Sequence, residues 1–465
     1  MNPRRKRLPY MVLILLSSIL AETPVVKGAI SVSSVEAIRV RDADLNGDGV
    51  VNIIDIYRIA KCFGSHPGSV RWNSKADLND DCSVNLKDIF LAGGMYGKKR
   101  ALTHVVAYVE DLTNETACFI ASHFDVVIIG FDTALMIGVI KALNPDIIVL
   151  GYRDIMAICP DFDDWEEVDS HEDWFLHDVH GNRLIHKKWG WYAMDVGNTG
   201  WRNHYANYMK DKLEISLFDG VFADDVWDTF FAGSGWNPWN VPIEDVPVEI
   251  KNRWHSDMLE MIRFCKESLR EKLLIVNTSN NDDYVYACDG KMEEGFAHPQ
   301  WWPLEKFHDD WDDWKGKVES LKNISQSGKY YLAQGGTIIP DNPTQAELDK
   351  VHDIMIYCFA SFLLGANGES LLSAGRVTFG FNKIQSKDGS RGYYPEFDVS
   401  LGSSVGEYYS IGSVYARDFT GGKVLVNPTK TSHTVSLGEN YKSLNEEIVS
   451  TITLAAHTAI ILLRM

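Results

Sequence analysis

Short apolar runs rich in β-branched residues alternate with longer mixed segments from residue 104 onward. This alternation predicts eight buried strands with room for a helix in most gaps. Buried parallel strands separated by helices are typical of α/β folds, and eight of them favour a closed (β/α)₈ TIM barrel. An open doubly wound sheet is disfavoured because no Gly-x-Gly-x-x-Gly follows the first strand. The predicted strands are 105–109, 126–130, 147–151, 220–224, 273–277, 290–294, 330–334 and 362–366.

The pattern changes near the end of the chain. Segments such as KVLVNP, HTVSLG and STITL alternate apolar and polar positions, with turn residues between them. Alternation of this kind predicts half-buried antiparallel strands. We therefore expect a barrel over residues 103–410 and a small antiparallel β-domain over residues 411–465.

A duplicated acidic segment precedes the barrel. Residues 44–55 read DLNGDGVVNIID, and residues 77–88 read DLNDDCSVNLKD, 33 positions later; each runs into an apolar helical pattern. Oxygen atoms at positions 1, 3, 5, 7, 9 and 12 of such a loop suit Ca²⁺, a hard cation with six to eight oxygen ligands. A single loop would pass for an acidic turn, but two copies in register argue against chance. The predicted ligands, for two Ca²⁺ ions, are Asp44, Asn46, Asp48, Val50, Asn52, Asp55, Asp77, Asn79, Asp81, Ser83, Asn85 and Asp88.

The second loop departs from the first at its sixth position. Cys82 stands where the first loop has Gly49, and a sharp turn at that point favours glycine. We therefore expect the second calcium site to be the weaker one. Pairing of Cys62 with Cys82 stays open, because spacing alone does not establish a disulfide.

The extreme N-terminus predicts export. Basic residues 4–7 precede a short apolar run, YMVLILLSSIL, and small residues follow. The run is shorter than the ~20 apolar residues that span a bilayer, so residues 1–29 are predicted to be a signal peptide, with an uncleaved anchor as the alternative. We expect a secreted, extracellular or cell-surface protein with no membrane contact beyond this segment. The net charge of −19 would repel a nucleic-acid backbone, so no nucleic-acid partner is expected.

Two strands end in acids at matching positions. FDGVFADD places Asp224 five residues after Asp219, and CDGKMEEGF places Glu294 five residues after Asp289. Catalytic residues of such barrels lie at the carboxyl ends of the strands, and paired carboxyls carry out glycoside hydrolysis. The doublets leave each role open by one position, so Asp225 and Glu293 remain candidates. Capping of the following helices is the structural alternative.

Further candidates lie in the connections beyond the strands. The third connection is unusually long, and loops of that length are uncommon unless functional. The segment GFAHPQWWP follows Glu294 directly. Aromatic faces stack on sugar rings but also pack under loops, so both interpretations stay open. The predicted substrate-binding residues are Trp191, Asp195, Asn198, Asp225, Glu293, His298, Trp301 and Gln334.

Two resemblances extend these predictions. The duplicated loop–helix segment, over residues 42–99, resembles the dockerin module, which implies binding of a cohesin-type scaffold protein. From about residue 103, the segments DWFLHDVHGNRL, WYAMDVGNTGWRNHY, FDGVFADDV, KMEEGF and YARDFTGGKVLVNPT resemble a glycoside hydrolase family of TIM barrels distantly akin to the endo-α-1,4-polygalactosaminidases. Related barrels imply Asp224 as nucleophile, Glu294 as acid/base and retention of anomeric configuration.

Together these observations predict a secreted, calcium-binding glycoside hydrolase that acts on a polysaccharide or oligosaccharide. The alternative is a non-catalytic carbohydrate-binding or cell-surface assembly protein on a degenerate barrel. The two hypotheses differ in whether Asp224 and Glu294 perform chemistry.

Overall fold

The structure of the chain is a computed structural model. It describes residues 43, 45, 51–79, 81–96, 103–109, 112–145, 147–231, 237–278, 282–299, 301–308, 311–337, 342–366, 377–381, 394–399 and 401–465. The predicted signal peptide and four predicted calcium ligands of the first loop, Asp44, Asn46, Asp48 and Val50, lie outside these residues. Within the described part of the chain, no helix combines the length and apolar character needed to cross a bilayer.

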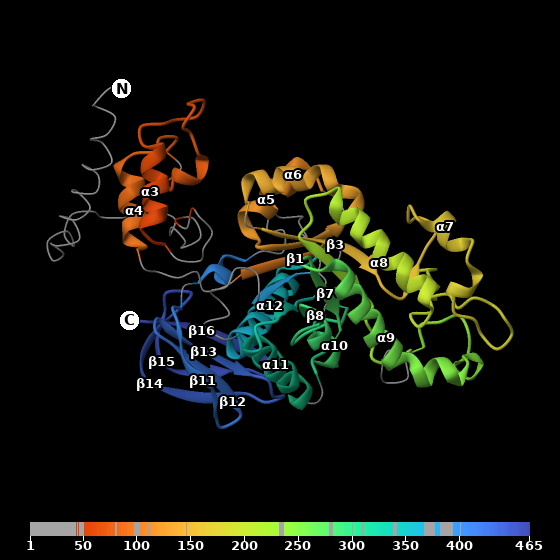
Figure 1. The fold of residues 1–465 in the computed structure, drawn as a ribbon. Helices are drawn as coiled ribbons and strands as arrows, with labels where there is room; N and C mark the ends of the chain where they lie inside the picture. Colours follow the sequence, from red (N-terminus) through yellow and green to blue (C-terminus); the bar gives the residue numbers. More distant parts are fainter. Residues whose placement is uncertain are drawn as a thin grey trace.

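Eight parallel strands close into a barrel in the order β1-β10-β9-β8-β7-β6-β3-β2, which confirms the predicted fold class (Figure 1). The strands are short, and all but one of them (GKMEE, residues 290–294) are mostly apolar, as expected where helices cover a parallel sheet. The strands are β1 (Thr103–Val109), β2 (Val126–Gly130), β3 (Ile148–Asp154), β6 (Gly220–Asp224), β7 (Leu273–Asn277), β8 (Gly290–Glu294), β9 (Tyr330–Gln334) and β10 (Val377–Phe381).

Helices follow most of the strands and surround the barrel (Figure 1). The long ones are α5 (Asn114–His123), α6 (Ala134–Leu143), α8 (Thr199–Glu214), α9 (Val248–Leu269), α11 (Trp311–Gln326) and α12 (Gln345–Gly365). The short elements of the barrel are η4 (Phe131–Thr133), β4 (Ala157–Ile158), α7 (Trp165–Asp169), η5 (Glu172–Trp174), β5 (Tyr192–Ala193), η6 (Ile243–Asp245), α10 (Asp282–Ala287) and η8 (Pro395–Asp398).

The prediction of a strand at residues 362–366 is wrong, because this segment forms the end of α12. The helix begins at a capping box in which Thr344 and Glu347 exchange side-chain and backbone hydrogen bonds. Its second half is buried on all sides, including against strands of the C-terminal sheet, so its sequence is apolar without a helical period. The eighth strand is β10, at residues 377–381.

The repeated Asp-Gly pair starts strands β6 and β8 in the same way. Asp219 accepts a hydrogen bond from the amide of Val149 (2.7 Å) at its Oδ2, and Asp289 accepts one from the amide of Leu274 (2.8 Å). A lysine on a covering helix contacts each of these carboxylates. A Cβ atom on Gly220 or Gly290 would lie 2.3 Å from a carbonyl oxygen of the next strand. The Asp-Gly pair therefore determines where each strand begins, and each strand ends in an acid, Asp224 or Glu294.

The C-terminal residues form a six-stranded antiparallel sheet in the order β11-β12-β13-β16-β14-β15, which lies against α12 (Figure 1). It begins at Ser404, before the predicted boundary at residue 411. Arg417, buried in this sheet, donates from Nη1 to the carbonyls of Leu363 (3.1 Å) and Leu364 (2.9 Å) in the last turn of α12. Its strands are β11 (Ser404–Ile411), β12 (Val414–Phe419), β13 (Gly422–Asn427), β14 (His433–Ser443), β15 (Ile448–Leu454) and β16 (Thr458–Arg464).

The duplicated N-terminal segment folds as two helices, α3 (Ile53–Cys62) and α4 (Leu86–Gly94), with the short 3-10 helix η3 (Ser74–Ala76) between them. Their buried faces form a separate small core that includes Ile56 and Ile59 of α3 and Ala92 of α4. Lys75 on η3 donates to the carbonyl of Leu143 at the end of α6 (2.7 Å), so the module touches the barrel beside α6 (Figure 1).

Candidate active site

Four strands deliver a polar side chain to the mouth of the barrel. Side chains two residues apart in a strand point to the same face, so the residue two positions after a barrel-filling apolar residue also points inward. The apolar members belong to one cluster at the centre of the barrel. The pairs are Phe222 with Asp224, Ile275 with Asn277, Met292 with Glu294, and Leu332 with Gln334.

Asn277 joins the two predicted catalytic acids. Its Nδ2 donates to Oδ1 of Asp224 (2.7 Å) and to Oε2 of Glu294 (3.0 Å). Since one nitrogen contacts both oxygens, these oxygens can lie no farther apart than the two contacts placed end to end. Such proximity of the nearest oxygens is in keeping with carboxyl groups ~5–5.5 Å apart, as in retaining glycosidases, where inverting ones have about 6.5–9.5 Å. The sequence analysis missed Asn277, although it ends a predicted strand at the same height as the acids.

Asp225 turns away from the strand direction in a left-handed backbone conformation, with φ 55°. Its amide donates to Oδ1 of Asp224 (2.9 Å), and its own Oδ1 accepts from Nε1 of Trp227 (3.1 Å). Burial, followed by the charges of Asp154 and Asp224, raises the pKa of Asp225 well above its usual value. The backbone amide of Asp225 therefore donates a hydrogen bond to Asp224, and the raised pKa of Asp225 means that its own carboxyl group favours the neutral form.

Asp154, at the end of β3, is a third acid of this group that the sequence analysis missed. It is 1% exposed, and it pairs in register with Asp224 across β3 and β6. Burial, followed by the charge of Asp224, raises its pKa to about 8. The signal was present in the alternation Leu150, Tyr152, Asp154, but the predicted strand ended at residue 151 and so stopped short of the acid.

The structure corrects the expectation that Glu293 contacts substrate. As the neighbour of an inward-facing residue, Glu293 points outward to the helices, where it is 0% exposed. Its carboxylate pairs with Lys291 (2.9 Å) and with Lys317 of α11 (2.7 Å). Burial would raise the pKa of Glu293, but the two lysines together outweigh it and lower the pKa. Glu293 is therefore a charged structural residue, and Glu294 is the member of the doublet at the mouth.

The loop after β8 brings an aromatic side chain next to Glu294. Gly295 has φ 80°, and a Cβ there would lie 3.2 Å from the ring of Trp301. Trp301 is 56% exposed, so its indole covers Gly295 while the rest of the ring stays open to solvent. His298 is instead fully buried, with its Nδ1 2.8 Å from the carbonyl oxygen of Gly336, and burial lowers its pKa. His298 thus supports the loop from within.

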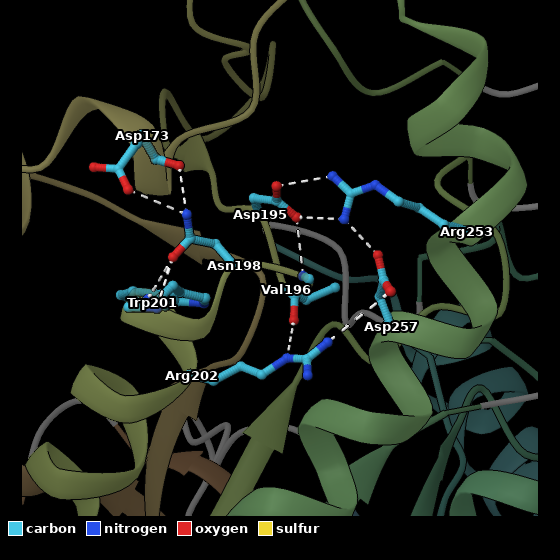
Figure 2. Close-up of polar contacts among 10 residues, drawn as sticks. Asp173, Asp195, Val196, Asn198, Trp201, Arg202, Arg253 and Asp257 are labelled. Carbon is cyan, nitrogen blue, oxygen red and sulfur yellow. Dashed lines mark hydrogen bonds and ion pairs between the residues drawn. The ribbon is translucent and has the colours of Figure 1, made fainter.

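The long third connection uses its predicted binding residues for internal contacts, as Figure 2 shows. Asp195 receives hydrogen bonds from Nη1 (2.9 Å) and Nη2 (2.8 Å) of Arg253 on α9. Asn198 caps α8 by accepting from the amide of Gly200 (2.7 Å), and its Nδ2 donates to the carbonyl of Asp173 (2.9 Å). These side chains join the connection to helices α8 and α9, in place of the expected substrate contacts.

Trp191 also packs within this connection. Its ring meets the ring of Phe162 edge-on at 5.5 Å between centroids. Phe162 in turn lies under the guanidinium of Arg153, 4.2 Å from the ring centroid. The structure therefore gives Trp191 a packing role, the second of the two interpretations left open for the aromatic residues.

Gln334 enters the mouth from β9 without a hydrogen-bond partner. It is 2% exposed, and neither its Nε2 nor its Oε1 forms a hydrogen bond. Its register partner on β8 is Glu294. Buried amides are nearly always satisfied in native proteins, so a buried donor and acceptor facing the mouth indicate a site for a ligand or water.

The second calcium loop draws its polar side chains together. The amide of Asp81 donates to Asp77 (3.2 Å) and Asn79 (3.3 Å) within the loop, and the amide of Asn85 donates to Oδ2 of Asp88 (2.7 Å). Burial raises the pKa of Asp77, and the charges of Asp88 and Asp81 add to this effect. Crowded acids of this kind fit a bound cation.

Cys82, at the sixth position of this loop, has φ 61°, the conformation that glycine adopts more easily. No group of three His, Cys, Asp or Glu side chains among the described residues is arranged as a metal site, but this count omits asparagine and carbonyl oxygens, which supply part of the predicted set. The structure describes Cys62 and Cys82 as free thiols.

Comparison with solved structures finds glycoside hydrolases. The glycoside hydrolase domain of PelA from Pseudomonas aeruginosa is 12% identical, with a TM-score of 0.40 over 64% of this chain and 98% of that one. The noncanonic maltogenic alpha-amylase AmyB from Thermotoga neapolitana is 12% identical, with a TM-score of 0.45 over 78% and 98%. A variant of the GH36 alpha-galactosidase AgaA from Geobacillus stearothermophilus is 9% identical, with a TM-score of 0.45 over 82% and 60%.

Comparison at the level of sequence is more specific. A search of curated protein sequences gave no significant match. Residues 42–91 match the family model of the dockerin type I domain, which confirms the resemblance of the duplicated segment. Residues 141–423, more than half of the chain, match a family model that includes strands β6 to β10 and the whole group of acids at the barrel mouth. The chain belongs to the family described as hypothetical glycosyl hydrolase family 15.

Proposed function

We propose that the protein is a secreted glycoside hydrolase that cleaves a polysaccharide or oligosaccharide with retention of configuration, using Asp224 and Glu294. The observation that carries this proposal is the contact of a single nitrogen, Nδ2 of Asn277, with both carboxylates. This shared contact brings the nearest oxygens of the two acids close together, which supports a covalent mechanism.

Asp224 is the nucleophile in this proposal. Its Oδ1 accepts hydrogen bonds from the amide of Asp225 and from Asn277, and donors to a carboxylate favour its charged form. Glu294 gives its proton to the glycosidic oxygen as Asp224 forms a bond to the anomeric carbon and the leaving group departs. Glu294 then takes a proton from a water molecule, which attacks the same carbon and releases Asp224.

Two further residues are proposed to bind the sugar. The exposed ring of Trp301 offers an apolar face beside Glu294 on which a pyranose can stack. Gln334 offers an unused donor and an unused acceptor next to the same acid, which suits sugar hydroxyl groups. A substrate with hydroxyls at this position would satisfy groups that are otherwise buried at a cost.

The proposal is tested by product release from a panel of α- and β-linked glycans. The wild type should release reducing ends from at least one glycan, and Asp224→Asn and Glu294→Gln should each lose most of that activity. Asp219→Asn and Asp289→Asn are matched controls, because they change an acid at the opposite end of the same two strands. If the wild type cleaves no glycan of the panel but binds some of them, the alternative of a non-catalytic carbohydrate-binding protein is the better account.

The N-terminal module is proposed to bind two calcium ions and a cohesin-type partner. Ile56 and Ile59 are buried in the module's core, so they do not form part of the proposed partner surface. Exposed apolar residues occur 33 positions apart in the two repeats: Ile53 with Leu86, Tyr57 with Phe90, and Phe63 with Tyr96. Equivalent positions of both repeats thus present apolar side chains to solvent.

This partner surface is separate from the contact with the barrel, which is made by Lys75 on η3. Pull-down with a recombinant cohesin domain in calcium should recover the wild type, and Tyr57→Ser with Phe90→Ser should abolish recovery. Equal recovery of both proteins would overturn the proposed surface.

A further inference from the structure

The buried carboxyl group of Asp154 has no assigned task in the two-acid mechanism. Its Oδ1 accepts from the amides of Met156 (2.8 Å) and Ala157 (2.7 Å). Its Oδ2 is buried without a partner in ordinary hydrogen-bond geometry. Asp154 is 1% exposed and pairs in register with Asp224, so we assign it a role that acts through Asp224.

The surroundings of Asp154 disfavour a negative charge. Asp224 at the end of β6 and Asp225 directly after it lie near Asp154. Burial and the charge of Asp224 raise the pKa of Asp154 and outweigh Asp225 and the amides of Met156 and Ala157, which lower it. Asp154 in turn raises the pKa of Asp225. The largest influences on Asp154 are burial, these two acids and two backbone amides, and none of them is a cation. An ionised carboxyl buried beside another carboxylate without a cation is costly.

Groups on the remaining neighbouring elements do not supply that cation. The guanidinium of Arg153 points to the opposite face of β3, where it pairs with Asp164 (2.8 Å). Tyr205 of α8 donates to the carbonyl of Arg153 (3.2 Å), and burial raises its pKa well above the usual value, which keeps the phenol neutral. Glu294 of β8 adds a further acid to the group by raising the pKa of Asp225.

We propose that Asp154 is a positioning residue that stays protonated, together with Asp225, and so keeps a neutral acid beside the nucleophile Asp224. This inference rests on the proposed function in assigning the nucleophilic role to Asp224. With its neighbours neutral, Asp224 carries the negative charge of the cluster, and Asn277 and the amide of Asp225 are aimed at it. Loss of the proton from Asp154 would place a second charge next to the nucleophile.

The proton on Asp154 has a defined effect on stability. The pKa in the folded protein, about 8, lies above the usual value of 3.8. Between these two pH values the folded state holds a proton that the unfolded chain releases, so the contribution of Asp154 to the free energy of unfolding falls as pH rises and levels off above the folded pKa. Asparagine, which is neutral at every pH, removes this decline.

The test compares thermal unfolding of the full chain and of Asp154→Asn from about pH 4 to about pH 8. The variant should gain Tm relative to the wild type as pH rises, by at least about 2 °C over the range. Asp178→Asn is the matched control, because Asp178 also accepts from two nearby backbone amides (2.9 and 2.8 Å) but has a lowered pKa, chiefly through the Asn182 side chain. The Tm difference of the control should stay nearly constant over this range, because the pKa of Asp178 is lowered from 3.8 and lies below it.

A Tm difference for Asp154→Asn that is independent of pH, as expected for Asp178→Asn, or a loss of Tm relative to the wild type as pH rises, would show that Asp154 is ionised and would overturn the proposal. If the variant does not fold, infrared titration of the wild type decides, since a carboxylic-acid carbonyl band should disappear near pH 8. On a glycan that the wild type cleaves, Asp154→Asn should move the alkaline loss of kcat to higher pH. If Asp154→Asn shows the expected Tm shift but the protein cleaves no glycan, the protonation of Asp154 is supported and only the proposed function is contradicted.

Discussion

Asn277 contributes one nitrogen to two carboxylates, so its removal should affect the reaction more than binding. Asn277→Ala should lower kcat on the order of 100-fold, because a preorganised donor to charged groups is lost, while KM changes little. Steady-state kinetics on a cleaved glycan measures this. Asn144→Ala is the control, since its side-chain amide donates to carbonyls at the end of α5, at 3.1 and 3.4 Å. An Asn277→Ala enzyme within twofold of wild-type kcat would contradict the assigned role.

Glu293 has the opposite assignment: its carboxylate stabilises the fold and takes no part in the reaction. Glu293→Gln leaves the buried Lys291 without a full counter-charge, and breaking a buried ion pair costs about 3–5 kcal/mol. Because the pKa of Glu293 is lowered, its stabilisation is present above the usual carboxyl pKa and is lost as pH falls through the folded value. Urea unfolding should show lower stability of the variant at pH 7 and a smaller difference in acid. Equal stability at both pH values would rule this out.

The role of a residue could be predicted from the sequence only where that role depends on neighbours along the chain. The sequence predicted Asp224 and Glu294 because each ends a strand of known direction. It could not predict that Asp195 binds Arg253, 58 residues away, or that Glu293 faces Lys317. Asn277 and Asp154 were missed because amides carry no charge to attract notice and because one predicted strand ended three residues early.

At the scale of elements, the loops before α3 and α4 should depend on calcium. Their crowded acids oppose closure without the ion, so binding free energy becomes folding free energy. Calorimetry of the full chain should show an unfolding transition that moves to lower temperature with a chelator. Asp77→Ala with Asp81→Ala should lose this response in the second loop, and the barrel transition should stay unchanged. Identical thermograms with and without chelator would contradict calcium binding.

The elements themselves were predictable where local pattern and burial agree. Strands β2, β6, β7 and β9 have the predicted bounds because each is a short, mostly apolar run. Strand β8, GKMEE, also has the predicted bounds, and the repeated Asp-Gly pair marks its start. The end of α12 was mistaken for a strand because a helix buried on all sides loses its amphipathic period. Its capping box at Thr344 and Glu347 was the available signal for a helix.

At the scale of the whole molecule, the barrel carries the candidate site, and the C-terminal sheet and the N-terminal module both contact the barrel. Arg417 of the C-terminal sheet donates to carbonyls of the last turn of α12, so sheet and barrel share a buried contact. The N-terminal module contacts α6 through Lys75, away from the apolar faces of α3 and α4. A partner can therefore bind the apolar faces of α3 and α4 while the contact between the module and the barrel stays in place.

The central claim, that Asp224 and Glu294 cleave a glycosidic bond through a covalent intermediate, is tested most directly by trapping. A 2-deoxy-2-fluoro glycoside of the sugar identified in the glycan panel should add its glycosyl mass to the intact protein, and peptide mapping should locate the adduct on Asp224. Asp224→Asn should give no adduct, and Asp219→Asn should give the wild-type result. An adduct on another residue, or an inverted anomer as the first product in nuclear magnetic resonance, would contradict the account.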